Sequence, residues 1–167
     1  MSRAFVKEES SEPPLLVPRA HLPVGVSNYV TRRGLALLRE ERSALEMTRP
    51  AGTGATEAGA ATELAAYHAR LAALDARIAS ALLVDPATLP QDQVRFSASV
   101  TVRSADGSER RYQIVGVDEA DAAAGRIAFT APLARALSGK RVGDVITLQR
   151  AQGDEELEIS GLDYARE

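Results

Sequence analysis

The stretch FTAPLARALSGKRVGD, from Phe129 to Asp144, carries the signals of one short helix between two strands. Pro132 suits a first helical turn, because its φ is already helical and its missing N–H would have no partner there. Gly139 favours the left-handed conformation that ends many helices. Gly143 followed by Asp144 is typical of a turn. The stretch therefore predicts a strand that ends near Phe129, a helix that begins at Pro132 and a new strand after the turn.

Alternating residues on both sides of this stretch predict a β-sheet. Apolar and polar residues alternate over 94–103, which indicates a strand with one buried and one solvated face. Asp106-Gly107 indicates a turn, and 109–117 would return as the antiparallel partner. Further strands are expected at 126–130, 144–150 and 155–161. The carboxy-terminal half is thus predicted to form a small, mostly antiparallel sheet with one helix packed on it.

The amino-terminal half predicts two paired helices. The first is expected from Thr31 to Thr48, with the Thr31 side chain as its N-cap. In the second, apolar residues recur at alternating spacings of three and four, the pattern of a coiled-coil seam. These residues are Leu64, Tyr67, Leu71, Leu74, Ile78 and Ala81. Two such helices in sequence pair most simply as an antiparallel hairpin, which gives an α+β chain.

Pro and Gly divide the chain into parts. Residues 1–28 are rich in Pro, Glu and Ser and are expected to be a disordered tail. The hairpin would occupy 29–85, with a Gly-rich flexible connector at 49–61 between its helices. Pro86 and Pro90 mark a linker over 86–93, and the sheet domain would follow over 94–167.

Composition excludes several classes of protein. The 167 residues carry a formal net charge of −3, whereas a protein that wraps duplex DNA is usually basic. The chain has no cysteine, so it forms no disulfide. It has no run of about 18 apolar residues, the length needed to span a membrane. We expect a cytoplasmic protein that does not associate with membranes.

The motifs together resemble the bacterial Gre family (GreA/GreB) of transcript-cleavage elongation factors. Besides 129–144, the resemblance rests on Tyr112–Glu119, on Gly125–Phe129 and on Tyr29–Gly34, and the opening Met1–Lys7 is similar to the GreB-type branch. It implies a coiled-coil hairpin followed by an FKBP-like domain. It also implies a factor that binds RNA polymerase at the secondary channel, contacts the RNA 3′ end, needs no cofactor of its own and is no enzyme itself. At most, it would stimulate RNA hydrolysis by the polymerase.

The resemblance also implies a degenerate hairpin tip. Two family acids there help to hold a second Mg²⁺ in the polymerase active centre, and a hard cation of this kind requires oxygen ligands. When the chain is aligned on Tyr67, Glu63 keeps one acid, while Ala60 and Ala66 stand at acidic positions of the family motif. Cleavage stimulation is therefore expected to be weakened or lost.

Two alternatives for the tip stay open. Glu57 lies near Glu63 and could replace the missing acid, which would give an active cleavage-stimulating factor. Alternatively, Thr62 could cap the second helix, with Glu63 in its first turn favouring the helix dipole. A third possibility for the chain as a whole is a coiled-coil interaction module that does not bind polymerase.

The family docks on the polymerase through its carboxy-terminal domain. The matching residues in this chain are Asp118, Glu119, Pro132, Leu133, Ala134 and Ala136. The alternative for Pro132 and Leu133 is purely structural, with one starting a helix and the other filling the core. Between residues 31 and 85, seven arginines are balanced by seven acids, so no long-range attraction for RNA is expected. His68 has no companion ligand and is expected to be an ordinary flanking residue.

Overall fold

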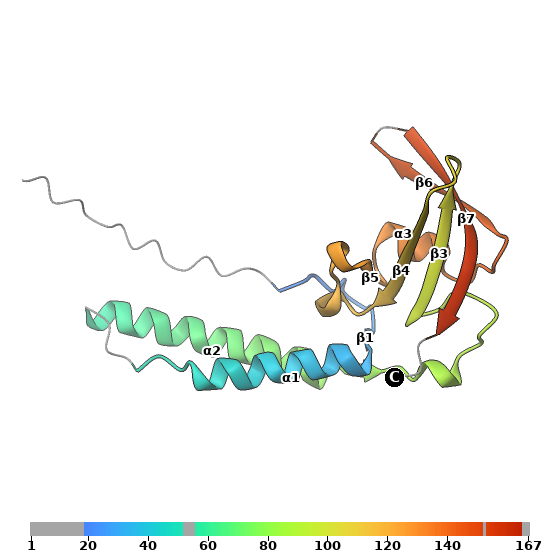
Figure 1. The fold of residues 1–167 in the computed structure, drawn as a ribbon. Helices are drawn as coiled ribbons and strands as arrows, with labels where there is room; N and C mark the ends of the chain where they lie inside the picture. Colours follow the sequence, from blue (N-terminus) through green and yellow to red (C-terminus); the bar gives the residue numbers. More distant parts are fainter. Residues whose placement is uncertain (1–18, 52–55, 152, 165–167) are drawn as a thin grey trace, which may run out of the picture.

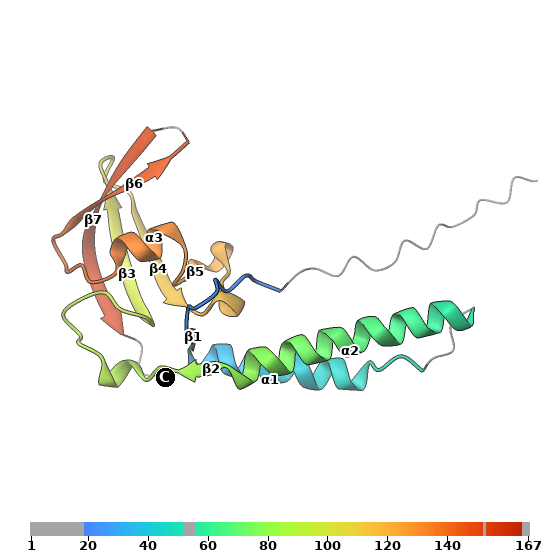
Figure 2. The ribbon, with the colours of Figure 1, turned by 180° about the vertical axis from the view of Figure 1, so that it is seen from behind.

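The computed structural model describes residues 19–51, 56–151 and 153–164 (Figure 1). A long helical hairpin projects to one side of a curled sheet that carries a short helix (Figures 1 and 2). This arrangement confirms the predicted α+β class. Of the expected tail, residues 1–18 lie outside the described residues, and so does the GreB-like segment Met1–Lys7.

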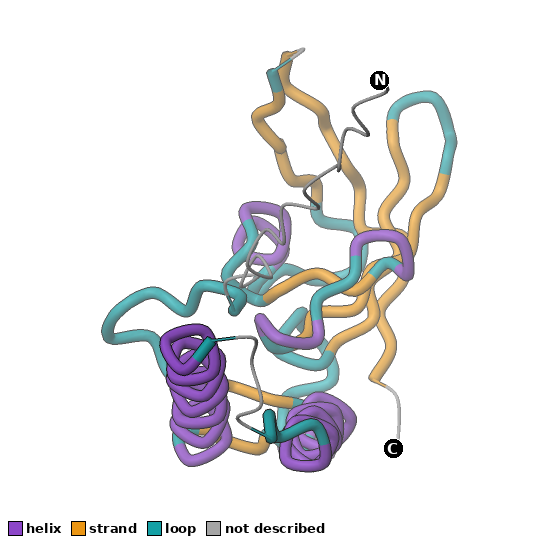
Figure 3. Tube along the Cα trace, turned by 90° about the vertical axis from the view of Figure 1, so that its left-hand side faces the viewer, coloured by secondary structure: helices purple, strands orange, loops and turns teal. Residues whose placement is uncertain are grey.

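The hairpin consists of α1 (Arg32–Met47) and α2 (Glu57–Ala79), which lie side by side in Figure 3. Thr31 caps α1 as predicted, since its Oγ1 accepts a hydrogen bond from the Gly34 N–H at 2.8 Å. The two helices share a buried apolar cluster with half-buried residues packed around it. The cluster contains Val30, Leu38, Leu45 and Leu74, surrounded by Leu35, Tyr67, Leu71, Ile78 and Ala81. Four residues of the predicted seam, Tyr67, Leu71, Leu74 and Ile78, therefore hold the two helices together, whereas Leu64 is not in this cluster and Ala81 belongs to β2 (Ala81–Leu83).

The connector between the helices is shorter than the sequence predicted. α2 begins at Glu57 and runs through Gly59, where the sequence had indicated a flexible segment up to residue 61. The physical reason is an N-cap: Oγ1 of Thr56 accepts a hydrogen bond from the Gly59 N–H at 3.1 Å. With 23 residues against 16, α2 is longer than α1 by about 10 Å.

A small parallel sheet at the base of the hairpin was not foreseen. β1 (Asn28–Val30) pairs with β2 (Ala81–Leu83), so the entry to α1 lies beside the exit from α2. The Asn28 amide donates to the Arg77 carbonyl at 2.9 Å, which adds a link to the last turn of α2. These contacts close the hairpin at its base.

The main sheet has the strand order β5-β4-β3-β7-β6. Its strands are β3 (Ala98–Ser104), β4 (Glu109–Val115), β5 (Arg126–Ala128), β6 (Val145–Arg150) and β7 (Gly153–Tyr164). Three of its pairings are antiparallel, and β4 with β5 is parallel. The parallel pair follows from a crossover that contains the 3-10 helices η2 (Val117–Glu119) and η3 (Ala122–Ala124). A third, η1 (Pro86–Thr88), lies in the segment expected as the linker.

The first predicted strand of this domain begins later than expected. Val94 is buried, but its N–H donates to the Lys140 carbonyl and its carbonyl accepts from Gly139, so it pairs with the loop after the short helix. Ser97 has a φ of 70°, which interrupts an extended chain. The alternation over 94–103 therefore reflects burial throughout, but β structure only from Ala98 onward.

The core of this domain lies between the inner face of the sheet and α3 (Pro132–Leu137). Val100 and Val102 of β3 alternate inward as predicted, and Ile159 of β7 lies beside them. Leu137 of α3 is fully buried against these residues. The sheet thus carries α3 at a fixed position on its surface.

Candidate functional site

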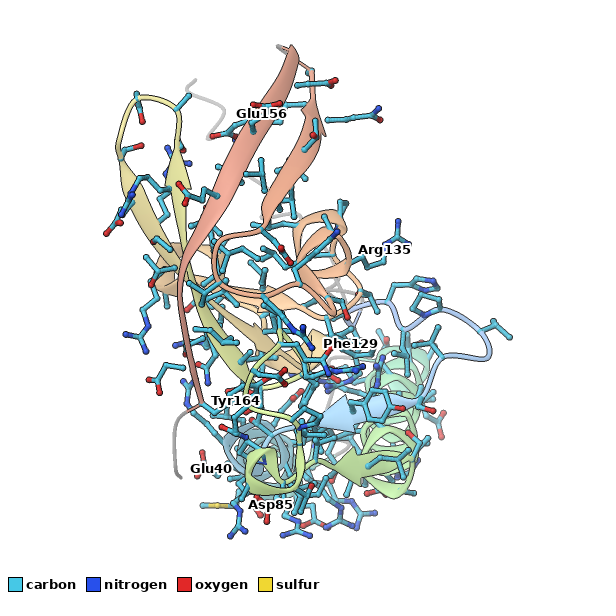
Figure 4. All side chains as sticks on the ribbon, turned by 90° about the vertical axis from the view of Figure 1, so that its right-hand side faces the viewer. Glu40, Asp85, Phe129, Arg135, Glu156 and Tyr164 are labelled. Carbon is cyan, nitrogen blue, oxygen red and sulfur yellow. The ribbon has the colours of Figure 1, made fainter. Side chains whose placement is uncertain are left out.

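The segment from β5 to β6 has the geometry predicted for residues 129–144. Pro132 occupies the first turn of α3. Gly139 has a φ of 78°, the left-handed value that ends a helix, and Gly143 has a φ of 93° in the turn before β6. Figure 4 shows Arg135 on α3 projecting from the sheet domain. Pro132, Gly139 and Gly143 therefore define where α3 begins, ends and leads into β6.

α3 turns one face inward and one outward. Ala134 is only 1% exposed, so its side chain belongs to the core and is not accessible to a partner. Leu133 and Ala136 are half-buried against the core. Pro132 and Arg135 are exposed. The surface that α3 offers therefore consists of Pro132 and Arg135 with the outer edges of Leu133 and Ala136.

Glu119 is a buried carboxylate at the junction of the hairpin and the sheet domain. Its side chain is 2% exposed, accepts a hydrogen bond from the Thr31 hydroxyl at 2.5 Å and lies 3.2 Å from the Arg33 guanidinium. A Cβ at position 34 would lie 2.8 Å from the same carboxylate, so Gly34 permits this approach. Glu119 therefore joins the start of α1 to η2 and leaves almost no surface for a partner.

Asp118 is also engaged within the chain. Its carboxylate lies 2.9 Å from the Arg19 guanidinium and 3.5 Å from that of Arg77 on α2. The Arg19 guanidinium also reaches Glu41 on α1 at 2.7 Å. Sequence reasoning missed this cluster, because nothing in a Pro-rich segment marks an arginine whose partners lie 22 and 99 positions away.

Three aromatic rings reinforce the junction. Tyr29 of β1 lies 5.9 Å from Phe96 and 5.6 Å from Phe129, measured between ring centroids, and the two phenylalanines are 5.8 Å apart. The Tyr29–Phe129 and Phe96–Phe129 pairs are edge-to-face, a favourable arrangement for aromatic rings. Tyr29 thus belongs to the strand that anchors the hairpin to the sheet domain.

The predicted tip acids lie on the first turns of α2. Glu57 and Glu63 are both exposed, and so is residue 62. The two acids are six residues apart, which places them about 9 Å apart along the helix axis and a third of a turn apart around it. They therefore do not converge on one ion. In the described ranges 19–51, 56–151 and 153–164, no group of three or more acids or histidines could hold a metal.

The alternative that Thr62 caps the helix is wrong. Thr56 is the N-cap, Glu57 is the acid of the first turn, and the Thr62 hydroxyl donates to the Ala58 carbonyl at 2.9 Å within the helix. The dipole-stabilising role expected for Glu63 thus passes to Glu57. Glu63 projects from the second turn and has no ion pair in the described part of the chain.

The charged residues of the hairpin largely pair with each other. Arg42 lies 2.5 Å from Asp75 and 3.0 Å from Glu46, and Arg70 lies 3.6 Å from Glu41. His68 is exposed beside Tyr67, as expected for a flanking residue. None of the helices described is long and apolar enough to cross a membrane.

The C-terminal family model for "Transcription elongation factor, GreA/GreB" matches residues 89–164. The GreA transcription elongation factor of Alkalilimnicola ehrlichii is 38% identical over 153 residues, covering 81% of this chain and 97% of that protein. The chain belongs to the GreA/GreB family. A GreA factor of Psychrobacter arcticus is also 38% identical, over 152 residues that cover 81% of this chain and 96% of the relative. Gre factors are non-enzymatic elongation factors that stimulate RNA cleavage by RNA polymerase, so membership implies polymerase binding.

Solved structures of Gre-type proteins are similar to this chain at lower identity. A GreA/GreB elongation factor from Nitrosomonas europaea matches with a TM-score of 0.42 and 21% identity, covering 81% of this chain and 98% of that one. Gfh1 of Thermus aquaticus also matches with a TM-score of 0.42 and 21% identity, covering 82% of this chain and 97% of that one.

The extent of the two GreA matches differs between this chain and its relatives. The matched 81% of its 167 residues is about 135 residues, so about 18 of the 153 positions aligned with the Alkalilimnicola factor have no counterpart here. The Psychrobacter comparison gives about 17 such positions by the same count, from 152 aligned residues. Both matches thus leave about 17 or 18 aligned positions of the relative without a counterpart in this chain.

Proposed function

We propose that this chain is a Gre-type elongation regulator that binds RNA polymerase at the rim of the secondary channel and has weakened or lost transcript-cleavage stimulation. The observation that carries the second part is the tip of the hairpin, where Glu63 stands alone. Ala60 offers no oxygen ligand, and Glu57 lies too far around and along the helix to share an ion with Glu63. Without a second carboxylate, the tip cannot clamp a Mg²⁺ ion in the polymerase active centre.

The unmatched positions of the two GreA relatives support the same proposal. We place most of these positions in the hairpin, because its first helix is only 16 residues long. If about 18 residues are lost equally from the two arms, the reach of the tip falls by about 13 Å. A shorter hairpin would hold Glu63 away from the catalytic ion even if its partner acid were restored.

For docking, we propose the exposed face of α3, centred on Pro132 and Leu133 and flanked by Arg135. Ala136 contributes its outer edge, and Ala134 supports this face from inside the domain. Asp118 and Glu119 are not part of it, because both pair with arginines of their own chain. An apolar centre with a charged rim is the usual anatomy of a protein interface. We also propose the boundaries 29–85 for the hairpin and 94–167 for the docking domain, and a cytoplasmic location.

Contact with the RNA 3′ end is expected to add little to binding. Arg42, Arg70 and Arg33 are each paired with an acid of the same chain, so these cations of the hairpin are already engaged. Electrostatic attraction for nucleic acid depends on unpaired cations that displace counterions. The assignment to the GreB-type branch rests on Met1–Lys7 and stays a prediction.

The decisive experiment measures RNA hydrolysis in backtracked polymerase complexes. The wild-type chain should release short 3′ fragments no faster than polymerase alone, and Glu63→Ala should match it. Rapid release that Glu63→Ala abolishes would instead establish an active factor. Ala60→Asp separates the two causes of loss, because positions 60 and 63 are neighbours on one helix face. A gain of cleavage would assign the loss to the missing carboxylate, and no gain would assign it to reach.

Binding is tested separately by retention on core polymerase. Wild type should be retained, and Pro132→Asp should weaken retention. Thr147→Asp, an equal charge change at an exposed site on β6, should leave it unchanged. If the folded wild-type chain is not retained at micromolar concentration, the polymerase proposal is wrong and an interaction module with another partner takes its place. If Pro132→Asp binds like wild type, docking does not use α3.

A further inference from the structure

We propose that the segment before β1, residues 19–27, is a strap that sets the angle between the hairpin and the sheet domain, and that Arg19 holds it in place. The strap runs between the sheet domain and α1 on its way to β1 (Figure 1). This inference concerns the protein on its own and holds whether or not it binds polymerase.

The hairpin has a first attachment at its base. The Thr31 hydroxyl donates to Glu119, and the Tyr29 ring packs on Phe96 and Phe129. Gly116 allows a close approach here, since a Cβ at that position would lie 2.8 Å from the Tyr29 carbonyl oxygen. All these contacts lie within a few residues of the start of α1. Contacts at the base alone fix where the hairpin is attached but constrain the direction of its long axis only weakly.

Arg19 supplies a second attachment farther along α1. One terminal nitrogen of its guanidinium lies 2.7 Å from Glu41 and the other lies 2.9 Å from Asp118. Glu41 is ten residues beyond Thr31, about 15 Å along α1. The planar fork of an arginine can hold two carboxylates at once in a defined geometry, which the single ammonium of a lysine cannot match. Arg19 therefore bridges the middle of α1 to the sheet domain.

α2 joins the same cluster through Arg77. Its guanidinium lies 3.5 Å from Asp118 and donates to the Ala20 carbonyl of the strap at 2.7 Å. The side chains of Arg19, Arg77 and Asp118 are only 20%, 13% and 10% exposed. Ion pairs screened this little by water are more consequential than exposed ones. Both helices, the strap and η2 thus meet at one polar cluster outside the apolar cores.

The loss of Arg19 should change the orientation of the hairpin without unfolding the hairpin or the sheet domain. Without Arg19, Asp118 keeps Arg77 as its partner, and the apolar cores of the hairpin and the sheet domain are untouched. Glu41 keeps Arg70, at 3.6 Å. Loss of Arg19 should therefore leave both parts folded and release the hairpin to move about its base.

The test is a distance measurement between two spin labels by pulsed electron paramagnetic resonance. The chain has no cysteine, so Ala65→Cys on α2 and Ala105→Cys in the turn after β3, both exposed sites, would carry the only labels. The otherwise wild-type protein should give one narrow distance. Arg19→Ala should lose that narrow distribution and give a broad one, while far-UV circular dichroism stays unchanged. Arg19→Lys should lie between the two.

The matched control is Arg39→Ala, which removes an exposed arginine of α1 that has no ion pair in the described part of the chain. It should keep the narrow distance. Superimposable distributions for wild type and Arg19→Ala would overturn the proposal, and so would equal broadening by Arg39→Ala. If Arg19→Ala does not fold, Arg19→Lys carries the test: a wild-type distribution would overturn the proposal, and a broadened one would support it.

Discussion

Thr31→Ala should destabilise the protein by far more than the loss of an ordinary helix cap. The Thr31 oxygen accepts from the Gly34 N–H at 2.8 Å, and its hydroxyl donates to the buried carboxylate of Glu119 at 2.5 Å. Loss of the cap alone costs about 1 kcal/mol. Loss of a hydrogen bond to a charged group adds about 1.5–3 kcal/mol, because little water can replace the donor. The expected loss in free energy of unfolding is about 3 kcal/mol in total.

Thr56→Ala provides the matched comparison. Thr56 caps α2 with the same atom and the same spacing, accepting from the Gly59 N–H at 3.1 Å, but it is exposed and has no second bond of this kind. Its loss should therefore cost only about 1 kcal/mol. Urea unfolding followed by far-UV circular dichroism measures both, with Thr31→Ser as the variant that keeps the hydroxyl and most of the stability. Equal losses for Thr31→Ala and Thr56→Ala would refute the reasoning.

A double-mutant cycle isolates the bond itself. Thr31→Ala and Glu119→Ala should be strongly non-additive, with a coupling free energy of about 1.5–3 kcal/mol. Residues that do not interact give additive losses. Additivity would show that the carboxylate is stabilised by other groups, of which Arg33 is the nearest charge at 3.2 Å.

Two further predictions address packing. Leu74→Ala should lower the free energy of unfolding by about 2–5 kcal/mol, because the Leu74 side chain is fully buried in the hairpin seam. Leu64→Ala should cost clearly less, because Leu64 is only half-buried. Equal losses of the two variants in urea unfolding would contradict the buried seam. Gly116→Ala should lower the free energy of unfolding by about 1–3 kcal/mol and lower the melting temperature, because the added methyl would meet the Tyr29 carbonyl oxygen at 2.8 Å. An unchanged melting temperature would show that β1 moves aside freely.

Local signals explain why much of the fold was predictable from the sequence. Pro132 and Gly139 bound α3 because their backbone preferences are intrinsic and need no partner. Thr31 capped α1 as predicted for the same reason, since its bond closes within three residues. The heptad spacing of α2 predicted its buried face, because helix geometry alone decides which residues share a side.

Other details of the fold did not follow from the sequence pattern. Val94 fits an alternating strand pattern, but pairs with the loop after α3 and not with a neighbouring strand. β5 follows β4 closely in sequence and yet pairs parallel to it, because the intervening 3-10 turns carry the chain back. The start of α2 was missed because glycines weaken a helix only modestly, and the cap at Thr56 outweighed them.

The residues of the candidate site also fall into those that the sequence indicated and those that only the structure placed. The sequence by itself indicated the family, the helix that begins at Pro132 and Glu63 as the acid expected at the tip, because each depends on residue type and spacing. Only the tertiary structure decided that Asp118 and Glu119 face inward, because their partners come from segments nearly a hundred residues away. A carboxylate has the same sequence signature whether it meets solvent, a partner or its own chain, and only the folded arrangement of charges distinguishes these cases.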